Sequence, residues 1–288
     1  MIIRRRILLA AAVPALAALA ACGSSDNSFS AGSSSGSAGA AGSSTSAGSS
    51  TSAASSTTGA SSGSGDQGDV AALAAQMRAG VAGITSAHLT LDTSVNGQTI
   101  TGAGDERLAN GKLTDLDISQ RVAGQDIRII IVGQKAWAQL PIGTVPNGGK
   151  PFVQVSEDSS NTIVRQLAAN LASTRSSASL DSSRAFVAAA KSLQKVGPED
   201  VAGTATTHYR VVVDPQRLPS TYPGKGDIAK AGVAEVPVEL YVDDQGRPAR
   251  VTTKLTVQGQ TVSSVVTVSR YNQPVTISAP PASKVGKL

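Results

Sequence analysis

Alternation of apolar and polar residues is the feature that most constrains the fold of this chain. Leu89, Leu91 and Val95 alternate with polar neighbours, and the same period of two returns at residues 236–242 and 251–257. A period of two places every second side chain on one face of a strand. Asn-Gly pairs at 96–97 and 110–111 favour tight hairpin turns. We therefore expect an antiparallel meander with one buried and one wet face.

Helical spacing interrupts this pattern three times. Apolar residues recur every three or four positions over 70–84, where Gly83 provides a stop, and over 163–171. A third helical face is expected from Leu180, Phe186, Val187, Ala190 and Leu193. About eight strands are expected around these helices, in one group over 89–140 and another over 206–268. The sequence thus predicts an α+β fold: one large, twisted antiparallel sheet with helices on one face.

The composition of the expected core leaves two alternatives open. Residues 127 and 129–132 are apolar and occupy both strand faces, and the two later helices are rich in Ala and poor in aromatic residues. Small side chains fill space sparingly, so an apolar cavity between sheet and helices is one alternative. A closed core of ordinary density is the other.

The N-terminus has the pattern of a bacterial lipoprotein signal. Three arginines at positions 4–6 precede an apolar stretch, residues 7–21, that is too short to span a bilayer comfortably. This stretch ends in Leu19-Ala20-Ala21-Cys22, which matches a lipobox with the cysteine as the acylated residue. Cys22 is the only cysteine in the chain, so disulfides and zinc-thiolate sites are excluded. We expect export by either the Sec or the Tat route, followed by removal of residues 1–21 and lipidation of Cys22.

A low-complexity segment separates Cys22 from the expected domain. Residues 23–68 are almost entirely Ser, Gly, Ala and Thr, with Phe29 as the only large apolar side chain. Such a segment buries too little surface to fold and is expected to act as a tether over residues 22–68, with a reach of roughly 35 to 40 Å. The single folded domain is expected at 69–288. Without the signal arginines, 22 basic side chains face 20 acidic ones, which gives no reason to expect nucleic-acid binding.

Residues with catalytic or metal-binding chemistry are few. The serine-hydrolase pattern G-x-S-x-G occurs at 32–36 and 59–63, but a Ser/Gly repeat matches it by chance. His88 and His208, the only histidines, lie on the polar register of strands, without a spaced partner for a metal. The Asp115/Asp117 pair and the Asp243/Asp244 pair are expected in a solvated face and a turn. We therefore expect no enzyme activity, no cofactor and no metal.

Several motifs resemble the LppX/LprA/LprF/LprG family of actinobacterial lipoproteins. Residues 201–211 are similar to its "G-x-x-x-x-H-Y" strand, and residues 236–248 resemble its "V-P-x-x-x-W/Y-V-D-x-x-G" hairpin. Residues 271–281 resemble its closing strand, and the Ser-Ala-His opening at 86–88 and the lipobox are also similar.

The resemblance implies a half-open antiparallel barrel whose concave face is covered by helices, as in LolA and LolB. It also implies an apolar pocket for acylated lipids or lipoglycans, carried or presented across the cell envelope. Its candidate lining residues are Leu89, Leu91, Ile129, Ile131, Val238 and Leu240. The expected protein is anchored through Cys22 on the extracytoplasmic face of the cell membrane. The alternative is an envelope interaction or sensor module without a lipid, binding an envelope protein on its wet face.

Overall fold

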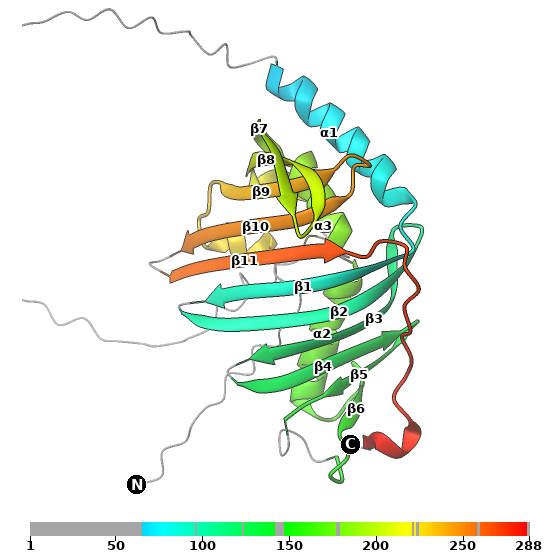
Figure 1. Ribbon diagram of the computed structural model, residues 1–288. Helices are drawn as coiled ribbons and strands as arrows, with labels where there is room; N and C mark the ends of the chain where they lie inside the picture. Colours follow the sequence, from blue (N-terminus) through cyan, green and yellow to red (C-terminus); the bar gives the residue numbers. More distant parts are fainter. Residues whose placement is uncertain are drawn as a thin grey trace, which may run out of the picture.

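The structure is a computed structural model that describes residues 65–95, 97–122, 124–141, 147–176, 179–220, 222, 225–257 and 260–286. The expected signal peptide, lipobox and Cys22 lie outside the described residues, as do both G-x-S-x-G patterns and the Gln258-Gly259 turn. The described residues form one mostly antiparallel sheet with α-helices on one face (Figure 1). The α+β class and the large curved sheet predicted from the sequence are therefore confirmed.

The elements follow one another in two meanders. The helices are α1 (Gly65–Ala82), α2 (Thr162–Ser176), α3 (Ser179–Ala188) and α4 (Lys225–Lys230). The first strands are β1 (Ser86–Val95), β2 (Gln98–Ala109), β3 (Lys112–Val122), β4 (Gln125–Val132), β5 (Lys135–Gln139) and β6 (Phe152–Val155). The later strands are β7 (Ala190–Val201), β8 (Thr204–Val213), β9 (Val236–Asp243), β10 (Pro248–Val257), β11 (Gln260–Ser269) and β12 (Val285–Gly286).

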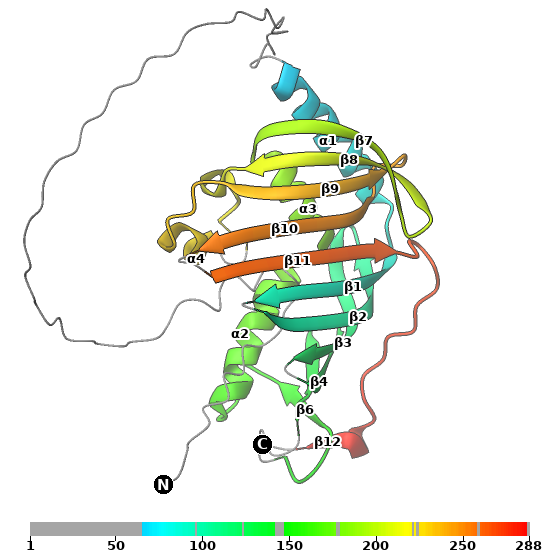
Figure 2. The ribbon, with the colours of Figure 1, turned by 60° about the vertical axis from the view of Figure 1, so that its left-hand side comes forward.

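Strand β1 pairs with β11 at the centre of the sheet. The strand order is β12-β6-β5-β4-β3-β2-β1-β11-β10-β9-β8-β7. Among the described strands, only the pair of β6 with the two-residue β12 is parallel. The turned view shows β1 and β11 side by side between the two meanders (Figure 2). The first and the last long strands therefore join the two halves of the sheet.

Helices α2 and α3 cover opposite halves of the same sheet face. Figure 1 shows both behind the strands; α2 contacts β3 and β6, and α3 contacts β8 and β10. Helix α2 covers the first apolar cluster and α3 the second, while α1 contributes to both. The first cluster joins α2 to β1–β6 and also includes Val81 of α1 and Val268 of β11. The second joins α1 and α3 to β7–β10 through Phe186 and Leu240. No helix in this described part is long and apolar enough to span a membrane.

Strands β2 and β3 approach each other closely at two glycines that face the concave side. A Cβ atom on Gly104 would lie 2.2 Å from the carbonyl oxygen of Asp117, and one on Gly102 would lie 2.9 Å from Cγ of Gln120. Neither position has room for a side chain unless its neighbour moves. The Gly102-Ala103-Gly104 segment thus allows the sheet to bend over this pair of strands.

A small cluster on the outer face explains the doubly apolar strand at 127–132. Ile130 and Trp137 are buried there with Phe152, while Val132 and Val285 pack at their edge. Val285 belongs to β12, so the C-terminal segment covers this part of the outer face. The inner residues Ile129 and Ile131 belong to the first cluster. Both faces of β4 are therefore covered over residues 129–132, each by different elements.

Several sequence expectations about the elements are wrong. The described residues form twelve strands rather than about eight, and residues 65–68 of the expected tether belong to α1. Ala190 and Leu193 begin β7 instead of continuing a helix. The segment 271–281, expected as a closing strand, has no strand pairing; it is held to the start of β1 because Asn272 N donates to the Ser86 carbonyl at 2.9 Å. Prolines at 274, 280 and 281 remove the donors that a paired strand would need.

Candidate functional site

The six residues predicted to line an apolar pocket all face the concave side of the sheet. Each is 6% exposed or less, but they divide between the two clusters. The first cluster contains Leu89, Ile129 and Ile131, and the second contains Val238 and Leu240. Leu91 is buried but belongs to neither cluster. The fold therefore brings them onto one face without gathering them into one group.

A row of buried residues in neither cluster runs between the two. It consists of Leu91 and Thr93 on β1, Val262 and Ser264 on β11, and Leu255 on β10. These five residues are called the central seam. Thr93 Oγ1 and Ser264 Oγ share a hydrogen bond of 3.1 Å, and Leu255 pairs with Val262 across the strands. The seam thus combines apolar side chains with one satisfied pair of hydroxyl groups.

Gln120 borders the central seam from β3. The side chain is 3% exposed, and neither its Nε2 nor its Oε1 has a hydrogen-bond partner in the described residues. In the strand register, Gln120 pairs with Gly102, and Gly102 pairs with Leu91 of the seam. Because Gln120 Cγ occupies the space of a Cβ at Gly102, the side chain leans across β2 toward the seam. A buried amide without partners is rare in proteins and costly.

Both histidines have partners on the outer face. His88 Nδ1 lies 2.7 Å from Asp105 Oδ1. His208 is buried and stacks on the ring of Tyr241, with ring centroids 4.3 Å apart, and its Nε2 lies 2.6 Å from Glu239 Oε2. Their predicted place on the polar register of strands is confirmed, although the burial of His208 was not expected. These partners give both imidazole rings a structural role.

Glu239 is held ionised by the residues around it. Burial acts to raise its pKa, but hydrogen bonds from Arg210 and His208 outweigh that effect and leave the pKa below its ordinary value. Arg210 Nε donates to Glu239 Oε1 at 3.0 Å. The carboxylate therefore ties β8 to β9 on the outer face.

The paired carboxylates of the sequence are neutralised by arginines. Asp115 accepts from Arg107 at 3.0 Å, while Asp117 accepts two hydrogen bonds from Arg128. Asp243 is buried rather than simply in a turn: it accepts from its own hairpin backbone and from Arg247 Nε. In the described ranges, no group of three or more His, Cys, Asp or Glu side chains is placed to hold a metal ion.

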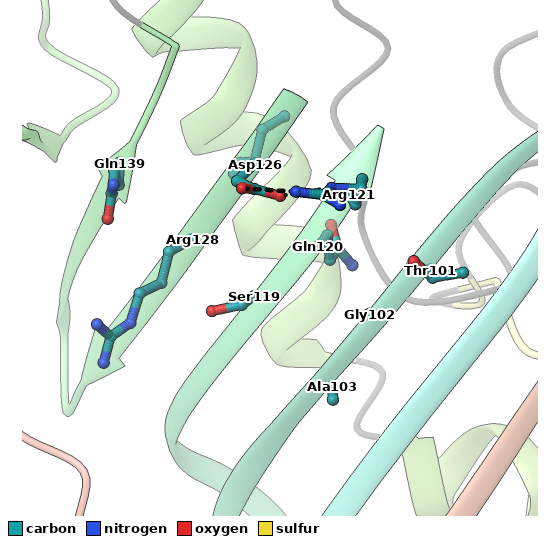
Figure 3. A pocket seen from close by; sticks show the side chains of 10 residues that line it. Thr101, Gly102, Ala103, Ser119, Gln120, Arg121, Asp126, Arg128 and Gln139 are labelled. Carbon is teal, nitrogen blue, oxygen red and sulfur yellow. Dashed lines mark hydrogen bonds and ion pairs between the residues drawn. The ribbon is translucent and has the colours of Figure 1, made fainter. Parts of the chain in front are cut away.

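A pocket of about 620 Å³ opens on the outer face of β2, β3 and β4 (Figure 3). Small exposed side chains, Thr101, Ala103 and Ser119, form part of its lining. Arg121 and Arg128 stand at its sides, and Figure 3 shows Arg121 paired with Asp126. Its lining also includes three residues at inward-facing positions, Gly102, Gln120 and Ile127, but none of the six predicted apolar residues.

The sequence pattern alone did not identify Gln120, the buried polar residue beside the central seam. The signal was present: in β3 the inward positions read Leu116, Ile118, Gln120, so a polar residue interrupts an apolar row. The glycine that faces Gln120 on β2 was a second signal. Neither has a meaning until the pairing of β2 with β3 is known.

Comparisons with known proteins give matches among solved structures. No protein-family model matches the chain, and no curated protein matches it in sequence. LprF from Mycobacterium bovis is 14% identical, with a TM-score of 0.49, covering 75% of this chain and 98% of its own. For LppX from Mycobacterium tuberculosis these values are 16%, 0.46, 72% and 99%.

A more distant match is the LolA superfamily protein NE2245 from Nitrosomonas europaea. It is 8% identical, with a TM-score of 0.24, and covers 74% of this chain and 96% of its own. LprF and LppX are both named in the family that the sequence motifs resemble. Two members of the LppX/LprA/LprF/LprG family are thus among the solved structures to which this chain is similar.

Proposed function

We propose that this protein is a membrane-anchored, noncatalytic lipoprotein that binds acylated lipids or lipoglycans and transports or presents them across the cell envelope. The acyl chains lie along the concave face of the sheet, between the two apolar clusters. The head group remains at the surface of the protein. Binding needs no chemistry, because burial of each methylene group contributes about 0.8 kcal/mol.

The observation that carries this proposal is the central seam. The apolar core beneath the helices is divided in two, and the buried residues between the halves, such as Leu91 and Leu255, belong to neither. An acyl chain inserted there separates two clusters that are covered by different helices, α2 and α3, and are joined at one end through α1. The cost of opening is therefore lower along the seam than within either cluster.

The N-terminal segment supports the same function. The lipobox at residues 19–22 anchors the protein through Cys22 on the outer face of the cytoplasmic membrane, and the Ser/Gly-rich tether gives the domain freedom of movement. An anchored domain with this reach can take a lipid from the membrane and hold it away from the surface. Cys22 and the tether are part of the proposal rather than of the described structure.

Native mass spectrometry of the mature full-length lipoprotein tests this function. The protein is produced in a lipid-rich bacterial host that attaches the anchor, and released from detergent micelles in the spectrometer. We expect bound acylated lipid in addition to the covalent anchor. A protein that carries no lipid, and takes up none when acylated glycerolipids are added to the micelles, contradicts the proposed function.

Two neighbouring substitutions on β1 locate the binding region. Leu91→Trp adds bulk at the seam and is expected to lower the bound-lipid fraction several-fold, because the indole occupies the space of an acyl chain. Thr90→Trp places the same indole on the exposed outer face and is expected to leave the fraction unchanged. Equal binding by both variants contradicts a site at the seam. Far-ultraviolet circular dichroism verifies that both variants fold.

The outer-face pocket favours a second candidate function, an envelope interaction module. Arg121, Arg128 and Gln139 surround small residues there, which suits a polar partner rather than an acyl chain. Capture of an envelope protein by wild type and by Leu91→Trp, but not by Arg128→Ala, is the result expected for this alternative. If Leu91→Trp fails to capture the envelope protein, binding of that partner depends on the lipid-binding state of the protein instead.

A further inference from the structure

The buried amide of Gln120 has no use in the structure as it stands. Nε2 has two hydrogens to donate and Oε1 accepts, yet neither atom meets a partner in the described part of the chain. The surroundings on its own face are apolar: Ile118 precedes it along β3, and Ile127 pairs with it on β4. Each unmet polar group in such surroundings destabilises the folded protein. A hydrophobic residue at this position would be more stable if stability were its only role.

The direction of this side chain points to a ligand. The side chain of Gln120 lies over Gly102, which is the β2 residue between Gln120 and Leu91 in the strand register. Because Gly102 has no side chain, none stands between the amide and Leu91 of the central seam. The seam side of the amide is therefore bounded by a glycine backbone. Among the described residues of β1, β2 and β3, the two amide atoms of Gln120 are the only buried side-chain polar atoms without a hydrogen-bond partner.

We propose that Gln120 recognises the ester carbonyl of an acylated lipid, with Nε2 donating a hydrogen bond to the carbonyl oxygen. This inference rests on the proposed function and names the chemical group that the site selects. An acyl ester has an apolar chain for the seam and, at the end of that chain, an acceptor without a hydrogen to donate. An amide donor buried next to the seam matches that acceptor. An ether-linked chain fills the seam equally well but leaves Nε2 unpaired.

Competition between an ester lipid and its ether analogue tests the inference. The mature full-length lipoprotein, freed of co-purified lipid in dodecyl maltoside, receives equal amounts of dioleoylglycerol and the matched di-oleyl ether of glycerol. Native mass spectrometry separates the two complexes by mass and gives the ratio of bound ester to bound ether. We expect about a tenfold preference for the ester, the value of one net hydrogen bond of about 1.4 kcal/mol.

Two variants distinguish Gln120 from the rest of the site. Gln120→Met keeps the length of the side chain without its amide and is expected to bring the ratio to about one, with ether binding retained. Gln139→Met makes the same change on the outward-facing register of β5 and is expected to keep the wild-type ratio. Gln120→Leu is the second variant if Gln120→Met does not fold.

The outcomes separate this inference from the proposed function. A wild-type ratio near one, or a preference that survives in Gln120→Met, overturns the role of Gln120 while lipid binding stands. A wild-type protein that binds neither lipid overturns both. A preference lost equally in Gln139→Met also contradicts the inference, because the outer face then controls the ratio.

Discussion

The two inward glycines of β2 allow a stability prediction that depends on what lies next to each. In Gly104→Ala the new Cβ falls 2.2 Å from the carbonyl oxygen of Asp117 and 2.6 Å from Cα of Ile118, both backbone atoms. In Gly102→Ala the nearest atom is Cγ of Gln120 at 2.9 Å, part of a flexible side chain. The first substitution must move a strand, whereas the second must move chiefly a side chain, with a smaller adjustment at the Ser119 carbonyl oxygen 3.2 Å away.

The magnitudes follow from these contacts. Ordinary van der Waals contact begins near 3.4 Å, so Gly104→Ala requires β2 and β3 to separate locally by about 1 Å, at a cost of roughly 3 kcal/mol. Alanine recovers about 0.5 to 1 kcal/mol in either variant, because it has fewer unfolded conformations than glycine. We expect Gly104→Ala to lower the free energy of unfolding by about 2 to 3 kcal/mol and Gly102→Ala by less than about 1 kcal/mol.

Urea unfolding of the mature protein, followed by tryptophan fluorescence, measures both values. Trp137 is the only tryptophan and is buried at β5, so its emission reports the half of the sheet that contains β2 and β3. The midpoint shifts at constant slope give the difference directly. If Gly104→Ala is as stable as Gly102→Ala, the close approach of β2 and β3 is refuted, and with it the position assigned to Gln120.

Three further predictions concern the second cluster and the outer face. Leu240→Ala leaves a void at a fully buried position and is expected to cost about 2 to 5 kcal/mol in thermal unfolding. Gly246→Ala, at φ +81° and with its Cβ 2.3 Å from the Gln76 carbonyl oxygen, is expected to detach α1 and speed hydrogen exchange there. Glu239→Gln is expected to destabilise by about 1 kcal/mol at pH 7, because His208 loses a charged partner. The folded pKa of Glu239 is lowered, so its contribution to stability is complete above the unfolded pKa of about 4.3 and is lost as the pH falls through the folded pKa. The melting temperatures of wild type and Glu239→Gln therefore converge as the pH falls below the folded pKa.

Strands with regular alternation were predictable, and β7 shows why others were not. The register of β7 against β8 shifts twice, between Ala190 and Ser192 and again between Lys195 and Gly197. Each shift disturbs the period of two on which the prediction depends. The buried Ala190 and Leu193 are consequently three residues apart, a spacing that is typical of a helix. Pro198 is tolerated because β7 pairs with β8 alone among the described strands.

The sequence predicted which face of the sheet carries the candidate site, but not where on that face the site lies. Alternation alone places Leu89, Leu91 and Ile129 on the same side of their strands as the helices. The division of that side into two clusters depends on where α2 and α3 lie, which is a matter of tertiary packing. The role of Leu91 between the clusters was therefore not visible in the sequence, although its burial was.

The central pairing of β1 with β11 affects the order in which the parts of the sheet form in a newly made chain. The hydrogen-bonded residues Thr93 and Ser264 are 171 positions apart, so this contact closes a very long loop, whereas the hairpins of each meander are local. Local hairpins form early, and distant strand pairs form slowly. During synthesis, the first meander emerges long before β11 does. The middle of the sheet therefore closes late, and a newly made chain remains open along the central seam until β11 arrives.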